Sequence, residues 1–301
     1  MTNAPHAIPA PASAPAPARA PSIIVGLIGA GIQASRTPPM HEQEADALGL
    51  RYIYRLIDLD QLQVGVDALP DLLEGAERLG FTGLNITYPC KQAIIPLLDE
   101  LSDDARAIGA VNTVVLSGGR RVGHNTDCSG FAEGFRRGLG DVPRARVVQL
   151  GAGGAGAAVA HAALQLGVGR LSLFDADPAR AVALAEQLNA RFGAGRADAI
   201  AELEPAMAQA DGLIHATPTG MAKFPGLPLP AELLHSRLWV AEIVYFPLET
   251  ELLREARARG CRTLDGGGMA VFQASDAFRL FTGVEPDPER IRAHFAAMGA
   301  N

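Results

Sequence analysis

Short apolar runs and amphipathic stretches alternate along most of the chain. The apolar runs are rich in β-branched and aromatic residues and predict strands at 23–28, 52–59, 83–87, 111–116, 122–125, 147–150, 171–174, 213–215 and 238–244. Apolar positions with helical spacing predict helices at 38–48, 69–79, 91–98, 129–139, 155–166, 178–192, 249–259, 269–281 and 288–298. Strands that alternate with helices are typical of an α/β fold, so we expect parallel sheets with helices on both faces.

The alternation falls into two series, which predicts two domains. A chain of 301 residues has the length of two average domains, and we expect the break around 127–130. Residues 1–21 are rich in Ala and Pro and belong to neither series. Because proline blocks helices and removes backbone donors, a disordered or polyproline-like tail is predicted for 1–21.

Composition and charge narrow the classes of function. The net charge is −7 and there is no basic tract, which argues against a nucleic-acid or anionic-membrane partner. No apolar run reaches the roughly 18 residues of a membrane span. The three cysteines, Cys90, Cys128 and Cys261, are scattered, and the seven histidines lack metal-ligand spacing. We therefore predict no disulfide framework, no metal site and a reducing, cytoplasmic location.

Two glycine-rich stretches follow predicted strands and match the dinucleotide pattern, at 29–34 and 151–156. A dinucleotide site needs a helix that starts within the glycines, because the helix N-terminus holds the pyrophosphate. Pro38 and Pro39 would interrupt such a helix after the first stretch, whereas only helix formers come after the second. The predicted cofactor site therefore comprises Gly151, Gly153, Gly154, Ala155 and Gly156.

An acidic residue after the next predicted strand indicates which dinucleotide is bound. Asp175 lies nineteen residues after Gly156, where a carboxylate accepts hydrogen bonds from the ribose and repels a 2′-phosphate. Asp177 adds negative charge, so NAD is favoured over NADP. The alternative is that Asp175 only caps the helix predicted to start at Pro178.

Polar residues gather at the ends of the strands in the first series. Asn85 and Thr87 precede Lys91, one of only two lysines among 26 basic residues, the other being Lys223. Lysine can give up a proton and arginine cannot readily do so, which makes Lys91 a candidate for chemistry. Uncharged donors and acceptors at this sheet edge suit a polyhydroxylated ligand.

At these residues the sequence resembles the shikimate dehydrogenase superfamily, most closely its quinate/shikimate dehydrogenase branch. The motifs that carry the resemblance are 35–38, 85–91, 109–113, 125–127, the second glycine stretch, 216–221, 245–250 and 265–278. Members that use NADP usually have an Asn-Arg-Thr-like segment where this chain has Asp175-Ala176-Asp177, and tend to have serine in place of Thr37. The NAD-using branch is similar to this chain at both places.

The resemblance implies an N-terminal α/β substrate domain, 22–127, that is completed by C-terminal helices in 266–301, and a Rossmann domain, 128–265, with the cleft between them. Ser35 and Thr37 are then expected at the substrate carboxylate, and Tyr245 at the carboxylate or elsewhere in the cleft. Ring hydroxyls would be bound by Asn85, Thr87, Asn112 and Gln273, with Lys91 and Asp127 as the catalytic pair. The nicotinamide side of the cofactor would be contacted by Thr217, Met221, Val244 and Gly268.

The function implied by the resemblance is reversible, NAD-dependent oxidation of a ring hydroxyl of quinate or shikimate. Whether it serves aromatic amino acid biosynthesis or quinate catabolism, and whether the protein is a monomer or a homodimer, stays open. So does the proton transfer, because Asp127 can take the proton beside a Lys91 ammonium, or the pair can share it. The alternatives are an NADP-dependent shikimate dehydrogenase, an aminoshikimate dehydrogenase and a non-catalytic NAD-binding sensor.

Overall fold

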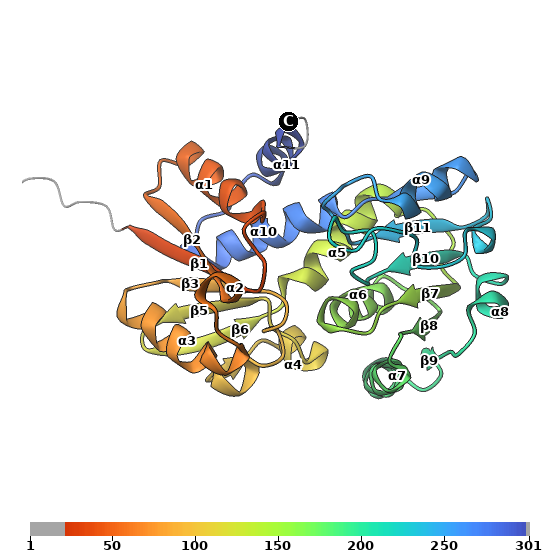
Figure 1. Ribbon diagram of the computed structural model, residues 1–301, viewed down its shortest axis with the longest axis horizontal. Helices are drawn as coiled ribbons and strands as arrows, with labels where there is room; N and C mark the ends of the chain where they lie inside the picture. Colours follow the sequence, from red (N-terminus) through yellow and green to blue (C-terminus); the bar gives the residue numbers. More distant parts are fainter. Residues whose placement is uncertain (1–21, 299–301) are drawn as a thin grey trace, which may run out of the picture.

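The computed structural model describes residues 22–298, which form two six-stranded sheets lying side by side (Figure 1). The tail predicted for 1–21 lies outside the described residues. Two long helices, α5 (Thr126–Leu139) and α10 (Gly267–Thr282), run between the sheets. The α/β class and the two-domain organisation expected from the sequence are confirmed.

The first sheet has the strand order β2-β1-β3-β5-β6-β4. Its strands are β1 (Ile23–Gly29), β2 (Tyr52–Asp58), β3 (Gly83–Ile86), β4 (Glu100–Leu101), β5 (Thr113–Ser117) and β6 (Arg120–His124). β5 is antiparallel to both β3 and β6, so the expectation of a wholly parallel sheet is wrong here. The β5–β6 pair is a hairpin closed by Gly118-Gly119, whose φ angles of 58° and 74° suit a tight turn between antiparallel strands.

Short helices accompany this sheet: α1 (Thr37–Ala47), α2 (Leu59–Leu62), α3 (Leu69–Arg78), α4 (Asp103–Ile108) and the 3₁₀ turns η1 (Val66–Ala68) and η2 (Ile95–Leu97). The helix predicted for 91–98 is wrong, because only η2 forms there. Pro96 lies within this segment and lacks the N–H that an α-helix needs. The sequence pattern also missed α4, which is six residues long and is capped by the Ser102 hydroxyl.

The second sheet is parallel throughout, in the order β12-β11-β10-β7-β8-β9. Its strands are β7 (Arg146–Leu150), β8 (Arg170–Phe174), β9 (Ala197–Ala199), β10 (Gly212–His215), β11 (Trp239–Glu242) and β12 (Arg262–Leu264). β9 and β12 were not predicted, and each is only three residues long. The order reverses between β7 and β10, and ligands of such sheets bind beyond the strand ends at this switch point.

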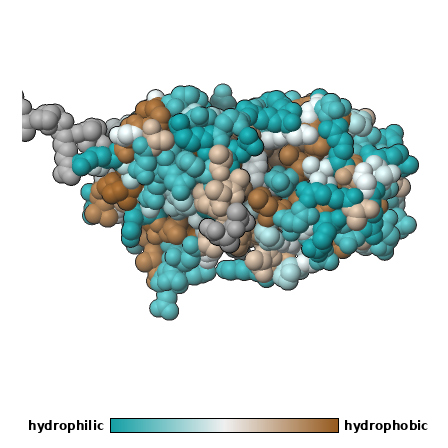
Figure 2. Space-filling view, turned by 90° about the horizontal axis from the view of Figure 1, so that it is seen from above, coloured by the Kyte–Doolittle hydropathy of each residue, from teal (hydrophilic) through white to brown (hydrophobic). Residues whose placement is uncertain are grey.

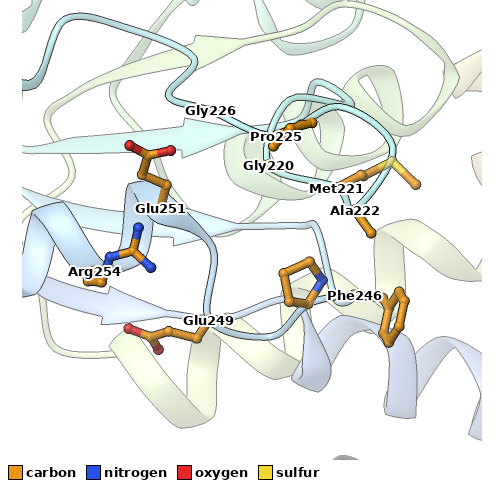
Figure 3. Close-up of a pocket in the computed structure, with 10 residues that line it drawn as sticks. Gly220, Met221, Ala222, Pro225, Gly226, Phe246, Glu249, Glu251 and Arg254 are labelled. Carbon is orange, nitrogen blue, oxygen red and sulfur yellow. The ribbon is translucent and has the colours of Figure 1, made fainter.

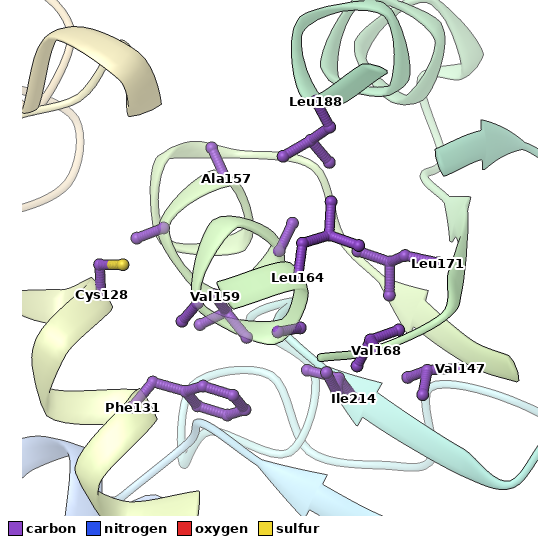
Figure 4. Packing of buried hydrophobic residues seen from close by; sticks show 14 of the residues in the cluster. Cys128, Phe131, Val147, Ala157, Val159, Leu164, Val168, Leu171, Leu188 and Ile214 are labelled. Atoms are coloured by element: carbon purple, nitrogen blue, oxygen red, sulfur yellow. The ribbon is translucent and has the colours of Figure 1, made fainter. Parts of the chain in front are cut away.

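Helices cover both faces of the second sheet: α6 (Gly154–Gln165), α7 (Pro178–Phe192), α8 (Leu203–Met207), α9 (Glu251–Ala258) and the 3₁₀ turn η3 (Ala231–Leu233). One core lies between the sheet and α5, α6 and α7 (Figure 4). The other core lies under α8 and α9. Val147 enters the first core and its neighbour Val148 the second, as the alternation of side chains along a strand requires.

The C-terminal part of the chain returns to the first sheet, as the resemblance implied. α10 crosses α5 so closely that a Cβ on Gly130 would lie 2.7 Å from the Gln273 backbone nitrogen. The last helix, α11 (Pro288–Ala297), is fixed to α1 by Arg290, which donates to both oxygens of the buried Glu44. Because α5 spans the region where we placed the first domain boundary, the boundaries 127/128 and 265/266 stay predictions.

The surface carries no broad apolar band on the face seen in Figure 2, where hydrophilic residues dominate and hydrophobic ones form separate groups. Within 22–298, no helix is both long and apolar enough to cross a membrane.

Candidate active site

Lys91 and Asp127 form an ion pair between the two sheets. Lys91 follows β3, Asp127 lies in the first turn of α5, and the Lys91 Nζ donates to the Asp127 Oδ2 at 2.5 Å. The two side chains are 17% and 8% exposed, so the pair is largely shielded from solvent. Gly154 lies against the lysine, since a Cβ there would be 3.6 Å from the Lys91 Cβ. The pair therefore faces the start of α6.

A buried network of hydrogen bonds fixes the first turn of α5, which carries Asp127. The Asn112 Oδ1 accepts from the Thr126 backbone N–H at 2.7 Å, and its Nδ2 donates to the Thr126 hydroxyl at 2.9 Å. Asn125 caps α5 by accepting from the Cys128 backbone N–H. These bonds fix the first turn of the helix that carries Asp127.

Asn85 is more enclosed than the sequence suggested. Its Nδ2 donates to the Asn112 carbonyl at 3.3 Å and to the Thr113 hydroxyl at 3.1 Å, and its Oδ1 accepts from the Tyr54 hydroxyl at 2.7 Å. Both amide N–H groups are thus engaged within the protein. We infer that Asn85 positions Asn112. Thr87 is half-buried, and its hydroxyl makes no hydrogen bond to another described residue.

Ser35 and Thr37 lie where the chain enters α1. The Ser35 hydroxyl accepts from the Thr37 backbone N–H at 3.3 Å, which holds the first residue of α1. Between them, Arg36 stacks its guanidinium on the rings of Phe246 and Phe295, 5.0 and 5.4 Å from their centroids. Sequence reasoning missed Arg36, although its place between two predicted carboxylate ligands was a usable signal.

Tyr245 lies near both Arg36, at the entrance to α1, and Asp127 of the ion pair. Its phenol pKa is raised by burial and by the Asp127 carboxylate, and the Arg36 guanidinium opposes that rise. Tyr245 therefore lies within electrostatic reach of both groups. Gln273, on α10, is half-buried and donates to the Ala270 carbonyl one turn earlier.

The second glycine stretch has the shape that a dinucleotide requires. A Cβ on Gly151 would lie 2.5 Å from the Ala216 carbonyl oxygen, and one on Gly156 would lie 2.3 Å from the Gly151 carbonyl oxygen, so both positions exclude side chains. A Cβ on Gly153 would meet nothing within 4 Å. Gly153 is the N-cap of α6 and supplies no side-chain cap, which leaves the first N–H groups of the helix for a phosphate.

Asp175 follows β8 and faces this loop. Its Oδ2 accepts from the Ala152 backbone N–H at 2.7 Å, and its Oδ1 accepts from the Asp177 backbone N–H at 2.9 Å. The N-cap of α7 is Asp177, which accepts from the Ala179 backbone N–H. The alternative reading of Asp175 as the helix cap is therefore wrong, and its carboxylate lies beside the glycine loop.

The remaining predicted cofactor contacts are spread over three places. The Thr217 methyl lies 3.1 Å from the Cβ position of Gly151, and Val244 follows β11. Gly268 packs on Gly134 where α10 crosses α5. Met221 is 40% exposed and lines a pocket of about 300 Å³ with Phe246 and others (Figure 3). Neither Lys91 nor Asp127 lines that pocket.

The two cysteines near the pair are core residues in this structure. Burial raises the pKa of Cys90 to about 11 and that of Cys128 to about 12, so both thiols stay protonated at neutral pH. No group of three His, Cys, Asp or Glu side chains among residues 22–298 is arranged to hold a metal ion.

A parallel sheet with a glycine loop at its switch point, and a shielded lysine–aspartate pair facing that loop, are typical of a two-domain enzyme that binds a dinucleotide. The family described as shikimate dehydrogenase substrate binding domain matches residues 27–114. The family described as alanine dehydrogenase/PNT, C-terminal domain, matches residues 116–234.

Relatives and a solved structure place the chain more closely. It is 63% identical to the shikimate dehydrogenase (NADP(+)) of Streptomyces avermitilis, over 92% of this chain and 96% of that protein. It is 51% identical to the quinate/shikimate dehydrogenase (NAD(+)) of Corynebacterium efficiens, over 92% and 99%. The structure of quinate dehydrogenase from Corynebacterium glutamicum in complex with NAD matches with a TM-score of 0.85 at 49% identity, covering 92% of this chain and 99% of that one. The chain belongs to the shikimate dehydrogenase family and is an NAD(P)-dependent oxidoreductase that acts on CH–OH groups.

Proposed function

We propose that this protein oxidises a ring hydroxyl of quinate or shikimate reversibly, with NAD as its preferred cofactor. The observation that carries the proposal is the shielded Lys91–Asp127 pair beside Gly154, at the start of the helix that would hold a pyrophosphate. Solved relatives support the substrate class, since one is a quinate dehydrogenase with NAD and another contains NADP(H) and shikimate.

When bound, the nicotinamide supplies the hydride chemistry, and the protein supplies position and proton transfer. The substrate hydroxyl would lie against Lys91 and Asp127, whose hydrogen bond lets the hydroxyl proton pass to the pair. Because the two groups are in direct contact, removing either one leaves the other without its partner, so they act as one unit. Their low exposure keeps bulk water from competing for that proton.

The carboxylate end of the substrate would lie at the entrance to α1. The hydroxyls of Ser35, Thr37 and Tyr245 are neutral donors, and Arg36 adds a positive charge to the same region. A guanidinium near the site offsets the cost of removing a carboxylate from water. This combination supports a cyclic carboxylate in preference to a neutral polyol.

The preference for NAD is supported by the Asp175 carboxylate beside the glycine loop. The 63% identical Streptomyces protein bears an NADP name, which favours a second candidate, an NADP-dependent shikimate dehydrogenase. Steady-state kinetics with quinate and shikimate, each against NAD and NADP, test both. We expect kcat/KM to favour NAD by at least about tenfold, since a 2′-phosphate would face a carboxylate. Equal or better use of NADP would establish the second candidate.

The same assay separates the enzyme from a non-catalytic NAD-binding sensor, which would bind the dinucleotide and turn over neither substrate. Aminoshikimate as a third substrate tests the remaining alternative, since an aminoshikimate dehydrogenase would prefer it over quinate and shikimate.

A further inference from the structure

A buried histidine and glutamate lie at the ends of β10 and β11, next to the predicted nicotinamide contacts. The side chains of His215 and Glu242 are both 0% exposed. The His215 Nδ1 lies 2.9 Å from each Glu242 oxygen, and its Nε2 lies 2.5 Å from the Thr217 hydroxyl oxygen. None of the chemistry described above uses this pair.

The glutamate is a hydrogen-bond acceptor on every side. Its Oε1 accepts from the Val244 backbone N–H at 2.9 Å, and its Oε2 accepts from the Thr250 hydroxyl at 3.1 Å. The Thr250 hydroxyl in turn caps α9 through the Leu253 N–H. Both Glu242 oxygens thus accept hydrogen bonds from other groups, and the contact with His215 is satisfied when the His215 Nδ1 carries a proton and donates it to Glu242.

This chain of bonds reaches the cofactor site at two points. Val244 and Thr217, both predicted to contact the cofactor, are each hydrogen bonded to one member of the pair. Thr217 also packs on Gly151, the first glycine of the loop, at the switch point of the sheet. One buried pair thus fixes both walls of that part of the site.

We propose that His215, oriented by Glu242, is a positioning residue that accepts the Thr217 hydroxyl proton and so leaves a lone pair of the Thr217 oxygen directed toward the nicotinamide carboxamide. This inference rests on nicotinamide dinucleotide binding, part of the proposed function. With its proton on Nδ1, His215 accepts the Thr217 hydroxyl proton at Nε2. The Thr217 oxygen also accepts from the Thr219 backbone N–H at 3.3 Å, and its remaining lone pair is then an acceptor for a carboxamide N–H.

A cofactor analogue without that N–H tests the proposal. Isothermal titration calorimetry would give Kd for NAD and for 3-acetylpyridine adenine dinucleotide, in which a methyl group replaces the amide NH2. Losing one hydrogen bond weakens binding by roughly two- to tenfold. We expect the wild-type protein to favour NAD over the analogue within that range. Thr217→Val should reduce the preference to nearly one, and Thr217→Ser should keep it.

Variants of His215 and Glu242 separate the two hydrogen bonds of the imidazole, one to Glu242 and one to Thr217. The amide nitrogen of His215→Asn takes the place of Nδ1, so the bond to Glu242 is kept and that to Thr217 is lost. The preference for NAD should therefore fall as in Thr217→Val. The same fall is expected for Glu242→Gln, which removes the carboxylate that orients the imidazole, so the test stands if one variant fails to fold.

His161 provides the matched control. It is buried on α6 in the same domain, and its Nε2 has no hydrogen-bond partner among residues 22–298. His161→Asn should alter stability without changing the preference for NAD over the analogue. An unchanged preference in Thr217→Val and in the folded His215 or Glu242 variants would overturn the inference. Failure of the wild-type protein to bind either NAD or NADP would refute the proposed function instead.

Discussion

The two glycine stretches of this chain have similar sequences, but their backbone N–H groups are engaged differently. Each comes directly after the first strand of its sheet along the chain, and each faces an aspartate at the end of the next parallel strand, Asp58 or Asp175. In the first stretch, Asp58 accepts from the backbone N–H groups of Gly31 and Ile32 and from the Gln33 side chain. In the second, Asp175 takes only the Ala152 N–H from the loop, and α6 starts at once.

The residues on the C-terminal side of each glycine stretch cause the difference. Pro38 and Pro39 delay the first helix to Thr37, so the intervening N–H groups turn inward to Asp58. The outer side of the first loop is filled as well, since the Lys223 Nζ lies 2.5 Å from the Cβ position of Gly31. A glycine pattern therefore indicates a phosphate site only where a helix starts within it, leaving its N–H groups unpaired.

The largest effect is expected at the lysines, because Lys223 lies beside the first glycine loop and Lys91 beside the second. Lys91→Ala or Asp127→Ala should lower kcat by about 10²–10⁴-fold, since the proton-transfer pair is lost. The Kd for NAD should barely change. The double variant should lose little more than either single one, because the groups act as a unit. Stopped-flow and steady-state rates measure this.

Lys223→Ala is the matched control at the first loop. It removes the other lysine without touching the pair, so kcat should change by less than about threefold. Near-wild-type kcat in Lys91→Ala, or a large loss in Lys223→Ala, would show that the chemistry is assigned to the wrong loop.

Asp58 should contribute to stability and not to cofactor choice. Burial raises the pKa of its carboxyl, but the hydrogen bonds from Gln33 and from the Gly31, Asp60 and Ile32 N–H groups lower it more, so the net shift is downward. Asp58→Ala leaves several buried donors unsatisfied and should cost about 1–3 kcal/mol at neutral pH.

The pH dependence of that cost has a definite sign. A lowered folded-state pKa adds stability above the unfolded value of about 3.9, and this is lost as pH falls through the folded value. The gap in unfolding free energy between the wild type and Asp58→Ala should therefore shrink between pH 7 and pH 3. Urea unfolding at both pH values measures it, and a gap that widens in acid would contradict the hydrogen-bond account.

Asp175 should, in contrast to Asp58, affect the choice between NAD and NADP. Asp175→Asn keeps the shape of the side chain but removes the charge that repels a 2′-phosphate. The ratio of kcat/KM for NADP to that for NAD should therefore rise about tenfold, which corresponds to about 1.4 kcal/mol. Asp58→Asn serves as the control and should leave the NAD to NADP ratio unchanged. If Asp175→Asn leaves the ratio unaltered, some other group selects the cofactor.

How far the sequence predicts this structure depends on how local each feature is. The second glycine loop and α7 arise from motifs within short segments, and the ranges for α7 agree at both ends. Lys91 and Asp127 are thirty-six residues apart, and only the family resemblance predicted them as a pair. The antiparallel β5 and the missing helix at 91–98 depend on Gly118-Gly119 and Pro96, which are local signals that outweigh the apolar periodicity around them.

Other features required the folded chain. The enclosure of Asn85 depends on Tyr54, thirty-one residues away, and the stacking of Arg36 depends on Phe295 from the far end of the chain. The His215–Glu242 pair joins two neighbouring parallel strands, and no local pattern marks which of their end residues will be buried together.

Thr37 gives the smallest and finest test, at the residue where the prolines set the start of α1. It is only 9% exposed, its backbone N–H is held by Ser35, and its hydroxyl makes no hydrogen bond to another described residue. Its methyl group restricts χ1 and so fixes the direction of the hydroxyl.

Quinate carries a tertiary hydroxyl beside its carboxylate, where shikimate has a ring double bond, so the two substrates differ at the end that Thr37 would contact. A less well directed hydroxyl weakens one hydrogen bond by roughly 0.5–1.5 kcal/mol. Thr37→Ser should therefore lower kcat/KM for quinate more than for shikimate, by about two- to tenfold, and Thr37→Ala should impair both. Steady-state kinetics with the two substrates measure the ratio, and a ratio unchanged in Thr37→Ser would remove Thr37 from substrate selection while leaving its place at the entrance to α1 intact.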